Sequence, residues 1–293
     1  MTNGADFTSG KDHTNENFPV GSFLIAARHR PVVMAFYRVA RQSDDIADHP
    51  GLAPVDKLAA LKRIEDSLLG KSTEDANAVA LRQVLAERGL TDQHALDLLE
   101  AFRCDATKQR YADWAELMDY CRYSAAPVGR FMLDVHGEDR ATWPASDALC
   151  AALQVINHLQ DCAEDYREMN RVYVPLDALA EAGLGVEALA EPKSTPALRS
   201  VIDRLTRRTD GLLQVSRALA PQVKDAGIGL EVAVIQSIAE AMTRKLLRCD
   251  PLAERAKLDK PQQAAAALKG VGAFALIRMG LGKGVKLSQT GAP

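Results

Sequence analysis

Apolar residues recur at intervals of three and four along most of the chain, and runs that alternate between apolar and polar residues are nearly absent. Intervals of three and four residues are typical of helices with one buried face, whereas in strands the apolar residues recur at every second position. The chain is therefore predicted to be all-α. We expect the main helices at about 31–48, 55–69, 77–88, 92–109, 113–136, from the N-cap Ser146 to Tyr166, 196–219 and 228–249.

Proline and glycine mark the expected ends of these helices. Pro31 suits the first turn of a helix, where the missing N–H costs nothing, and the segment His49-Pro50-Gly51 ends that helix. Trp143-Pro144 interrupts the chain again before the helix that Ser146 is expected to cap. These signals predict one all-α domain over 16–285, between a disordered tail at 1–15 and a short tail at 286–293.

Composition narrows the classes of partner. A chain of 293 residues with 47% hydrophobic residues can bury a large core, and its net charge of −3 argues against nucleic acid as a partner. The five cysteines are scattered without zinc-ligand spacing, which predicts buried thiols in a reducing cytoplasm.

No membrane-spanning run and no secretory signal is recognised in the sequence. The last apolar stretch, 264–287, also carries four cationic residues. A packed terminal helix is the favoured interpretation of this stretch, and contact with a membrane surface is the alternative. The expected location is the cytoplasm, with the inner face of the membrane as the alternative.

Two predicted helices carry acidic residues at helical spacing. On the first, Tyr37, Arg41, Asp44 and Asp48 fall within a stripe roughly 60° wide, whereas Asp45 lies off it. Apolar residues border that stripe, which favours an inward-facing site over a broad solvated side.

The second helix repeats this arrangement. Gln154, Asn157, Asp161 and Asp165 occupy a stripe roughly 80° wide, and Glu164 lies beside it. Aspartate is a poor residue for a helix interior, and like charges four residues apart weaken a helix further, so helix stability does not explain these residues. Carboxylates that converge from two helices need a cation, and Mg²⁺ prefers one or two carboxylates together with water and phosphate oxygens.

Other interpretations of the charged and glycine-rich segments stay open at this point. Both acidic runs could be solvated helix ends. The basic segment 28–30 and Arg122 could attract phosphate, but exposed basic residues are common. The segment 270–275 matches the pattern GxGxxA, but it follows a helical stretch and not a strand, so a dinucleotide site is not expected there.

Three motifs in order resemble those of the squalene and phytoene synthase family, over about residues 16–250. They are the segments 37–48 (YRVARQSDDIAD), 120–129 (YCRYSAAPVG), and 154–165 followed by Arg171-Val172-Tyr173-Val174-Pro175. The resemblance implies an isoprenoid synthase fold, in which two aspartate-rich helices flank a central apolar cavity.

The resemblance also implies roles for individual residues. The implied ligands of Mg²⁺ are Asp44, Asp48, Asn157, Asp161 and Asp165. The implied catalytic residues are Tyr120, which would border the reacting carbons, Asp44 and Asp161. The implied substrate-binding residues are Ser22, Tyr37, Arg41, Gln154, Arg171 and Tyr173, together with Ser124 and Gly129, which would let a prenyl chain approach the helix backbone.

Within the family, Glu16-Asn17-Phe18-Pro19-Val20 and Pro127 resemble the hydroxysqualene synthase branch of bacterial hopanoid biosynthesis. That branch implies ionisation of presqualene diphosphate and capture of the cation by water, and other enzymes of the same pathway as partners. Three alternatives remain. One is condensation of two farnesyl diphosphates to presqualene diphosphate or squalene. Head-to-tail synthases and terpene cyclases fit the second acidic motif less well. The last is a non-catalytic subunit that binds a prenyl lipid or scaffolds other enzymes.

Overall fold

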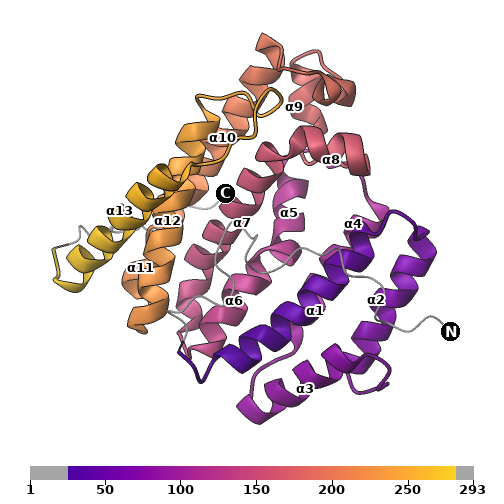
Figure 1. Cartoon of the computed structure of the whole chain (residues 1–293), viewed down its shortest axis with the longest axis vertical. Coiled ribbons are helices and arrows are strands. Elements are labelled where there is room, and N and C mark those ends of the chain that lie inside the picture. The colour runs from indigo at the N-terminus through magenta and orange to yellow at the C-terminus, as the bar shows by residue number, and fades with distance from the viewer. Residues whose placement is uncertain (1–25, 282–293) are drawn as a thin grey trace.

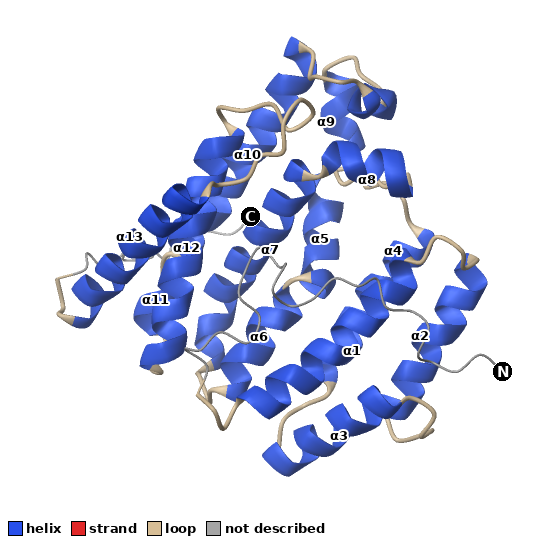
Figure 2. Cartoon of the chain, in the orientation of Figure 1, coloured by secondary structure: helices blue, strands red, loops and turns tan. Residues whose placement is uncertain are grey.

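The fold consists of helices alone in the part of the chain that the structure, a computed structural model, describes, residues 26–281 (Figures 1 and 2). The only β-type contact among these residues is an isolated bridge between Arg110 and Val172. The predicted all-α class is therefore confirmed. The expected tails at 1–15 and 286–293 lie outside the described residues.

The helices before the second acidic motif are α1 (Arg30–Asp48), α2 (Pro54–Leu68), α3 (Ala76–Arg88), α4 (Gln93–Thr107), α5 (Trp114–Ser124), α6 (Ala126–Val135) and a 3₁₀ turn η1 (Arg140–Thr142). The remaining elements are α7 (Trp143–Gln160), α8 (Cys162–Met169), α9 (Leu176–Glu181), η2 (Val186–Ala190), α10 (Pro196–Ser216), α11 (Leu219–Gln222), α12 (Ala226–Leu246) and α13 (Lys260–Arg278).

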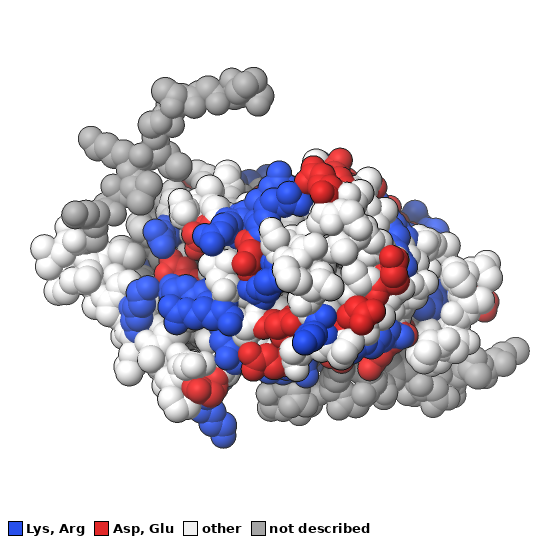
Figure 3. Space-filling view, turned by 90° about the horizontal axis from the view of Figure 1, so that it is seen from above, with Lys and Arg blue, Asp and Glu red and all other residues white. Residues whose placement is uncertain are grey.

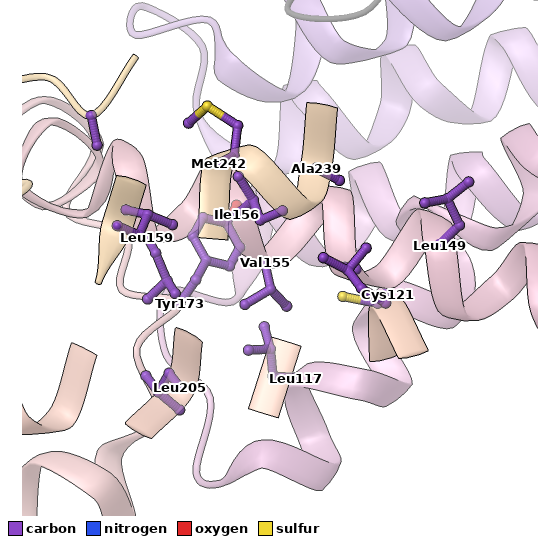
Figure 4. Packing of buried hydrophobic residues seen from close by; sticks show 14 of the residues in the cluster. Leu117, Cys121, Leu149, Val155, Ile156, Leu159, Tyr173, Leu205, Ala239 and Met242 are labelled. Carbon is purple, nitrogen blue, oxygen red and sulfur yellow. The ribbon is translucent and has the colours of Figure 1, made fainter. Parts of the chain in front are cut away.

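Two hydrophobic clusters form the core, and they meet at helix α6. The smaller cluster joins α1 to α2, α3 and α4, and it includes the stacked rings of Phe36 and Phe131, whose centroids are 3.9 Å apart. The larger cluster is built around α7, which packs against α6, α10 and α12. Figure 4 shows its side chains meeting from α5, α7, α10 and α12 around Tyr173. The first acidic motif lies on the central helix of the smaller cluster, and the second begins on the central helix of the larger cluster and continues into α8.

Helix α12 is the single described helix that is long and apolar enough to span a membrane. However, 61% of its most apolar window is buried inside the protein, between α7, α10 and α13. Burial on this scale is the property of a core helix.

The predicted helix over 113–136 is wrong as a continuous element. The chain leaves helical geometry at Ala125, where φ is −121° and ψ is −48°, and α6 begins with Pro127 in its first turn. Proline lacks an N–H and its ring clashes with the carbonyl group four residues earlier, so α5 cannot run through this point. The break separates Tyr120 on α5 from Gly129 on α6.

The helix predicted from Ser146 to Tyr166 differs at its start and is interrupted near its end. It starts at Trp143, with Pro144 in its first turn, and Ser146 lies buried inside the helix and does not cap it. At Asp161 φ is −105° and ψ is 10°, so α7 ends there and α8 begins. Just before the break, the buried amide of Gln160 donates to the carbonyl oxygen of Ala256, at 2.5 Å, a long-range contact that no local pattern encodes.

The prediction of buried thiols is confirmed for three of the five cysteines. All five are unpaired thiols, three of them buried and two half-buried. On the face seen in Figure 3, acidic and basic side chains alternate without a broad basic surface. This distribution fits the small net charge.

Candidate active site

Three aspartates of the first acidic motif are held by arginines. Arg41 donates from Nη1 to Asp44 Oδ2 at 2.8 Å, and from Nη2 to Asp45 Oδ1 at 2.6 Å. Arg171 donates from Nη1 to Asp48 Oδ1 at 2.6 Å. The side chains of Asp44 and Asp48 are 38% and 39% exposed, whereas that of Asp45 is only 6% exposed. Asp44 and Asp48 can therefore receive a ligand, while Asp45 holds the Arg41 side chain in place.

The second motif spans the break between α7 and α8. Asn157 lies half-buried on α7, Asp161 stands at the junction, and Asp165 lies half-buried on α8. The exposed Arg255 lies 3.6 Å from Asp161. Glu164 is exposed, in agreement with its place beside the predicted stripe. The break therefore sets the relative directions of Asp161 and Asp165.

Arg171 connects the two motifs. It follows α8, and it reaches α1 through Asp48 and through the carbonyl oxygen of Ala47, at 3.2 Å. It also donates to the carbonyl oxygen of Asp105 on α4, at 3.0 Å. Its side chain is 8% exposed, so a charged hydrogen-bonded group is fixed between three helices. The substrate-binding role of Arg171 stays a prediction, but its place beside Asp48 fits that role.

Asp105 is a member of this site that the sequence analysis missed. Its carboxylate accepts from the Tyr120 hydroxyl at 2.9 Å to each oxygen, and from the Tyr173 hydroxyl at 3.1 Å. A signal was available in the sequence, because Leu98, Ala101 and Asp105 share one face of a predicted helix, so that a lone carboxylate continues an apolar stripe.

An aromatic wall adjoins Asp105. It consists of the rings of Tyr111, Tyr120, Tyr173 and His158. His158 stacks on Tyr173 with ring centroids 3.5 Å apart, and its Nε2 lies 3.1 Å from the amide nitrogen of Gln154. Burial and the charge of Arg171 lower the pKa of His158 to about 3, so the ring is neutral near pH 7. This wall consists of π faces and hydroxyl groups, and the one cation that the described residues place over its rings is Lys108, whose Nζ lies 4.7 Å from the centroid of Tyr111.

The carboxylates of the two motifs share one electrostatic environment. Burial and the charge of Asp48 raise the pKa of Asp44 to about 7. Burial, then Asp161, raise the pKa of Asp165 to about 7, and Asp48 contributes to that shift from the opposite helix. Burial raises the pKa of Asp105 to about 6, against the opposing effect of Arg171. Like charges therefore face each other across α1, α4 and α8.

A divalent cation fits this set of donors. In residues 26–281, no three His, Cys, Asp or Glu side chains converge closely enough to enclose a metal ion by themselves. Mg²⁺ commonly takes one or two carboxylates and completes its shell with water and phosphate oxygens. Burial is the main cause of the raised pKa values of Asp44 and Asp165, and neighbouring carboxylates add to it, so a bound cation would favour the ionised forms. The residues present fit Mg²⁺ ions that bind together with a diphosphate.

The remaining predicted residues fall into three groups. Ser22 lies outside the described residues. Tyr37 and Gln154 are half-buried on the helices that carry the two motifs. The buried hydroxyl oxygen of Ser124, where α5 ends, has no hydrogen-bond partner within the described part of the chain.

Gly129 lies at a close contact between α6 and α7. A Cβ atom there would lie 2.4 Å from Ser146 Oγ and 2.6 Å from Cys150 Sγ. The structure thus gives Gly129 a helix-packing function, and its contact with a prenyl chain stays a prediction.

An all-α fold with two facing acidic motifs defines an isoprenoid synthase, and comparison with known proteins specifies the family. Residues 11–262 match the family model described as squalene/phytoene synthase. The chain is 52% identical to a hydroxysqualene synthase of Rhodopseudomonas palustris over 97% of both chains. It is 50% identical to a hydroxysqualene synthase of Zymomonas mobilis, over 89% of this chain and 88% of that one. The chain belongs to the squalene/phytoene synthase family.

Solved structures agree with this assignment. The squalene synthase HpnC of Alicyclobacillus acidocaldarius aligns with a TM-score of 0.71 and 30% identity, over 80% of this chain and 90% of that one. A dehydrosqualene synthase also aligns with a TM-score of 0.71, but at 20% identity it supports the fold alone. Enzymes of this family generally use divalent metal ions and act on prenyl diphosphates.

Proposed function

We propose that the protein is a hydroxysqualene synthase that converts presqualene diphosphate and water into hydroxysqualene and diphosphate. The observation that carries the proposal is the convergence of the two acidic motifs, through Asp48 and Arg171, beside the aromatic wall. The choice of substrate is supported by relatives of that name with about half of their residues identical over nearly their full length.

The acidic end of the site would bind the diphosphate. Asp44, Asp48, Asn157, Asp161 and Asp165 would hold Mg²⁺, which neutralises the negative charge of the departing diphosphate when it is bound. Arg41 and Arg171 are oriented by their own carboxylate partners, so their guanidinium groups need little rearrangement when they meet phosphate oxygens.

The aromatic wall would face the carbocation. The C–O bond to diphosphate breaks and its electron pair leaves with the diphosphate, so a cyclopropylcarbinyl cation remains. The π faces of Tyr120, Tyr173 and His158 would stabilise this cation during its rearrangement. A water oxygen then forms the new C–O bond, and its proton passes to the released diphosphate or to solvent. The prenyl chains would occupy the predicted apolar cavity, which excludes bulk water.

The deciding experiment supplies each substrate separately. Purified protein with Mg²⁺ receives presqualene diphosphate alone or farnesyl diphosphate alone, and products are identified by mass spectrometry. We expect hydroxysqualene from the first substrate and no C30 product from the second. Turnover of farnesyl diphosphate without turnover of presqualene diphosphate would instead assign the condensation reaction.

The alternative of a scaffold or lipid carrier has its own test. The double variant Asp44→Ala/Asp161→Ala removes one carboxylate from each motif and should abolish turnover. We also expect it to fail to restore the product in cells that lack the native chain. Full restoration would favour a non-catalytic subunit, because a scaffold does not need these carboxylates.

We further propose that the protein acts on the cytoplasmic side of the membrane, beside the enzymes that supply its substrate and consume its product. The chemistry supports this placement, because the C30 substrate carries two long apolar chains and the product has lost the diphosphate that made the substrate amphipathic.

A further inference from the structure

Helix α13 is apolar on both of its sides. Its inner side packs against α12 through Ala266, Gly270 and Phe274, all of which are buried. The contact is close, because a Cβ atom on Gly270 would lie 2.6 Å from the carbonyl oxygen of Ala233. In Figure 1, α13 lies beside α12 at the edge of the molecule, on the side opposite α2 and α3. The orientation of α13 is therefore set by its inner side, and residues 26–281 leave its outer side uncovered.

The uncovered side of α13 forms one continuous apolar surface. With about 100° per residue, its members fall within a stripe roughly 140° wide. All are exposed, and Leu268 and Met279 are 71% and 62% exposed. The members of this outer α13 face are Ala264, Ala265, Leu268, Val271, Gly272, Ala275, Leu276 and Met279. Of the nine large hydrophobic residues exposed in the described chain, five lie on α13 or just after it.

The charged residues of α13 that border this face are all cationic, and one of them, Lys269, is paired with Glu240 on α12, with Lys269 Nζ 3.3 Å from Glu240 Oε2. Lys269 borders it on one side, and Lys260 and Arg278 border it on the other. The sequence contains no Asp or Glu from residue 260 to residue 293, and it continues past the helix with Lys283 and Lys286. Anionic lipid headgroups are complementary to an apolar face that α13 borders with cationic residues alone. For a protein partner, we would expect α13 to carry acidic residues at this border as well.

We infer that the outer α13 face docks the protein on the surface of an anionic membrane, with the helix axis parallel to the bilayer plane. The outer side chains enter the boundary between headgroups and acyl chains, while α12 holds the helix from above. Docking of this kind places the enzyme where a C30 substrate is dissolved. The biological reason rests on the proposed function, but the docking itself is measured without any turnover.

The test is sedimentation of the full-length protein with vesicles. We use equal parts of phosphatidylglycerol and phosphatidylcholine, and phosphatidylcholine alone as the neutral comparison. We expect binding to the anionic vesicles, about tenfold weaker binding to the neutral ones, and loss of the difference at 1 M salt. Failure of the wild-type protein to bind the anionic vesicles would overturn the inference.

Two matched variants locate the contact. Leu268→Glu/Met279→Glu places two charges on the outer α13 face, and Val55→Glu/Leu69→Glu places two charges on exposed apolar residues at α2. We expect the first variant to bind anionic vesicles at least about tenfold more weakly and the second to bind within about twofold of wild type. Equal losses in both variants would show that net charge, and not this face, controls binding.

A second copy of the chain is the competing occupant of the same face. Sedimentation velocity in the absence of lipid distinguishes the two. If the wild-type protein is a dimer that Leu268→Glu/Met279→Glu converts to a folded monomer, the face is a subunit contact and the inference is wrong. We expect an unchanged oligomeric state, and turnover of detergent-dispersed presqualene diphosphate within about twofold of wild type. If the proposed function fails, that turnover is lost in every variant while the vesicle result still stands.

Discussion

The two acidic motifs have nearly the same residue spacing but are supported in different ways. The first lies on an unbroken helix, and ion pairs with Arg41 and Arg171 hold all three of its aspartates. The second crosses the break between α7 and α8, where an ion pair joins Asp161 to the exposed Arg255 at 3.6 Å. Arginine side chains hold the first motif, whereas the second changes direction at a break in the helix backbone. Substitutions that are equivalent in sequence should therefore differ in their effect on stability.

The largest effect is expected from removing one charge in each motif. Asp48→Asn and Asp161→Asn should each lower turnover by about 10²- to 10³-fold, because each removes charge that offsets the metal ions at the diphosphate. Only Asp48→Asn should also lower the free energy of unfolding, by about 2 kcal/mol, because it removes the charge of the carboxylate that pairs with the buried Arg171. Diphosphate release and thermal unfolding measure the two effects. Equal loss of stability in both variants would contradict the comparison.

Replacing the arginine that joins the motifs should have the next largest effect. Arg171→Lys keeps the positive charge but cannot reach Asp48 and the carbonyl oxygens of Ala47 and Asp105 together. We expect turnover to fall by about 10- to 100-fold. Arg255→Lys is the matched control for the second motif, and it should stay within about twofold of wild type because its contact is long and exposed. The reverse order of effects would assign the connecting role to Arg255.

The stability of the protein without metal should fall as the pH rises. The pKa values of Asp44 and Asp165 are raised to about 7 and that of Asp105 to about 6, all above the ordinary value of an unfolded chain. The folded state therefore holds more protons between pH 4 and 7, and the stability that these protons contribute is lost as the pH passes the folded pKa values.

In chelator, Tm should be several degrees higher at pH 5 than at pH 8, and Asp105→Asn should reduce the part of this change that lies near pH 6. Glu116→Gln, at an exposed carboxylate of lowered pKa outside the site, serves as the control and should leave this fall in Tm in place. A Tm that rises from pH 5 to pH 8 would contradict the raised pKa values.

The smallest effects are expected for Asp45 and Glu164, the two carboxylates that lie beside the predicted stripes. Asp45→Asn should lower turnover a few-fold and the free energy of unfolding by about 1 kcal/mol, because Asp45 is buried against Arg41. The exposed Glu164 is its counterpart in the second motif, so Glu164→Gln should change neither quantity measurably. A larger loss in Glu164→Gln would place that side chain among the metal ligands.

Helical periodicity was sufficient to predict most of the fold. The expected bounds of the first helix, 31–48, differ by one residue from α1, and those of 77–88 differ by one residue from α3. These helices have strong local end signals, such as Pro31 in the first turn of α1 and Gly89 at the end of α3, where φ is 63°. The prediction failed at Ala125 and Asp161, where the chain changes direction inside an apolar pattern.

Some residues of the candidate site could be predicted from the sequence, and others could not. Asp44, Asp48, Asp161 and Asp165 could be found because carboxylates at helical spacing oppose local helix stability and so indicate another use. Asp105 gave only the signal of a carboxylate on an apolar stripe, and the contacts of Asp105 and His158 could not be predicted because they are made with Tyr120 and Tyr173 on other elements.

The sequence by itself determined the all-α class, the positions of most helices and the two acidic stripes, because these follow from periodicity within single helices. Only the tertiary structure decided that Arg171 joins α1 to α4, that Asp105 lies beneath the aromatic wall, and that α13 has an uncovered apolar side. Each of these depends on contacts between helices far apart in the chain, and local spacing carries no information about which helix will be the neighbour.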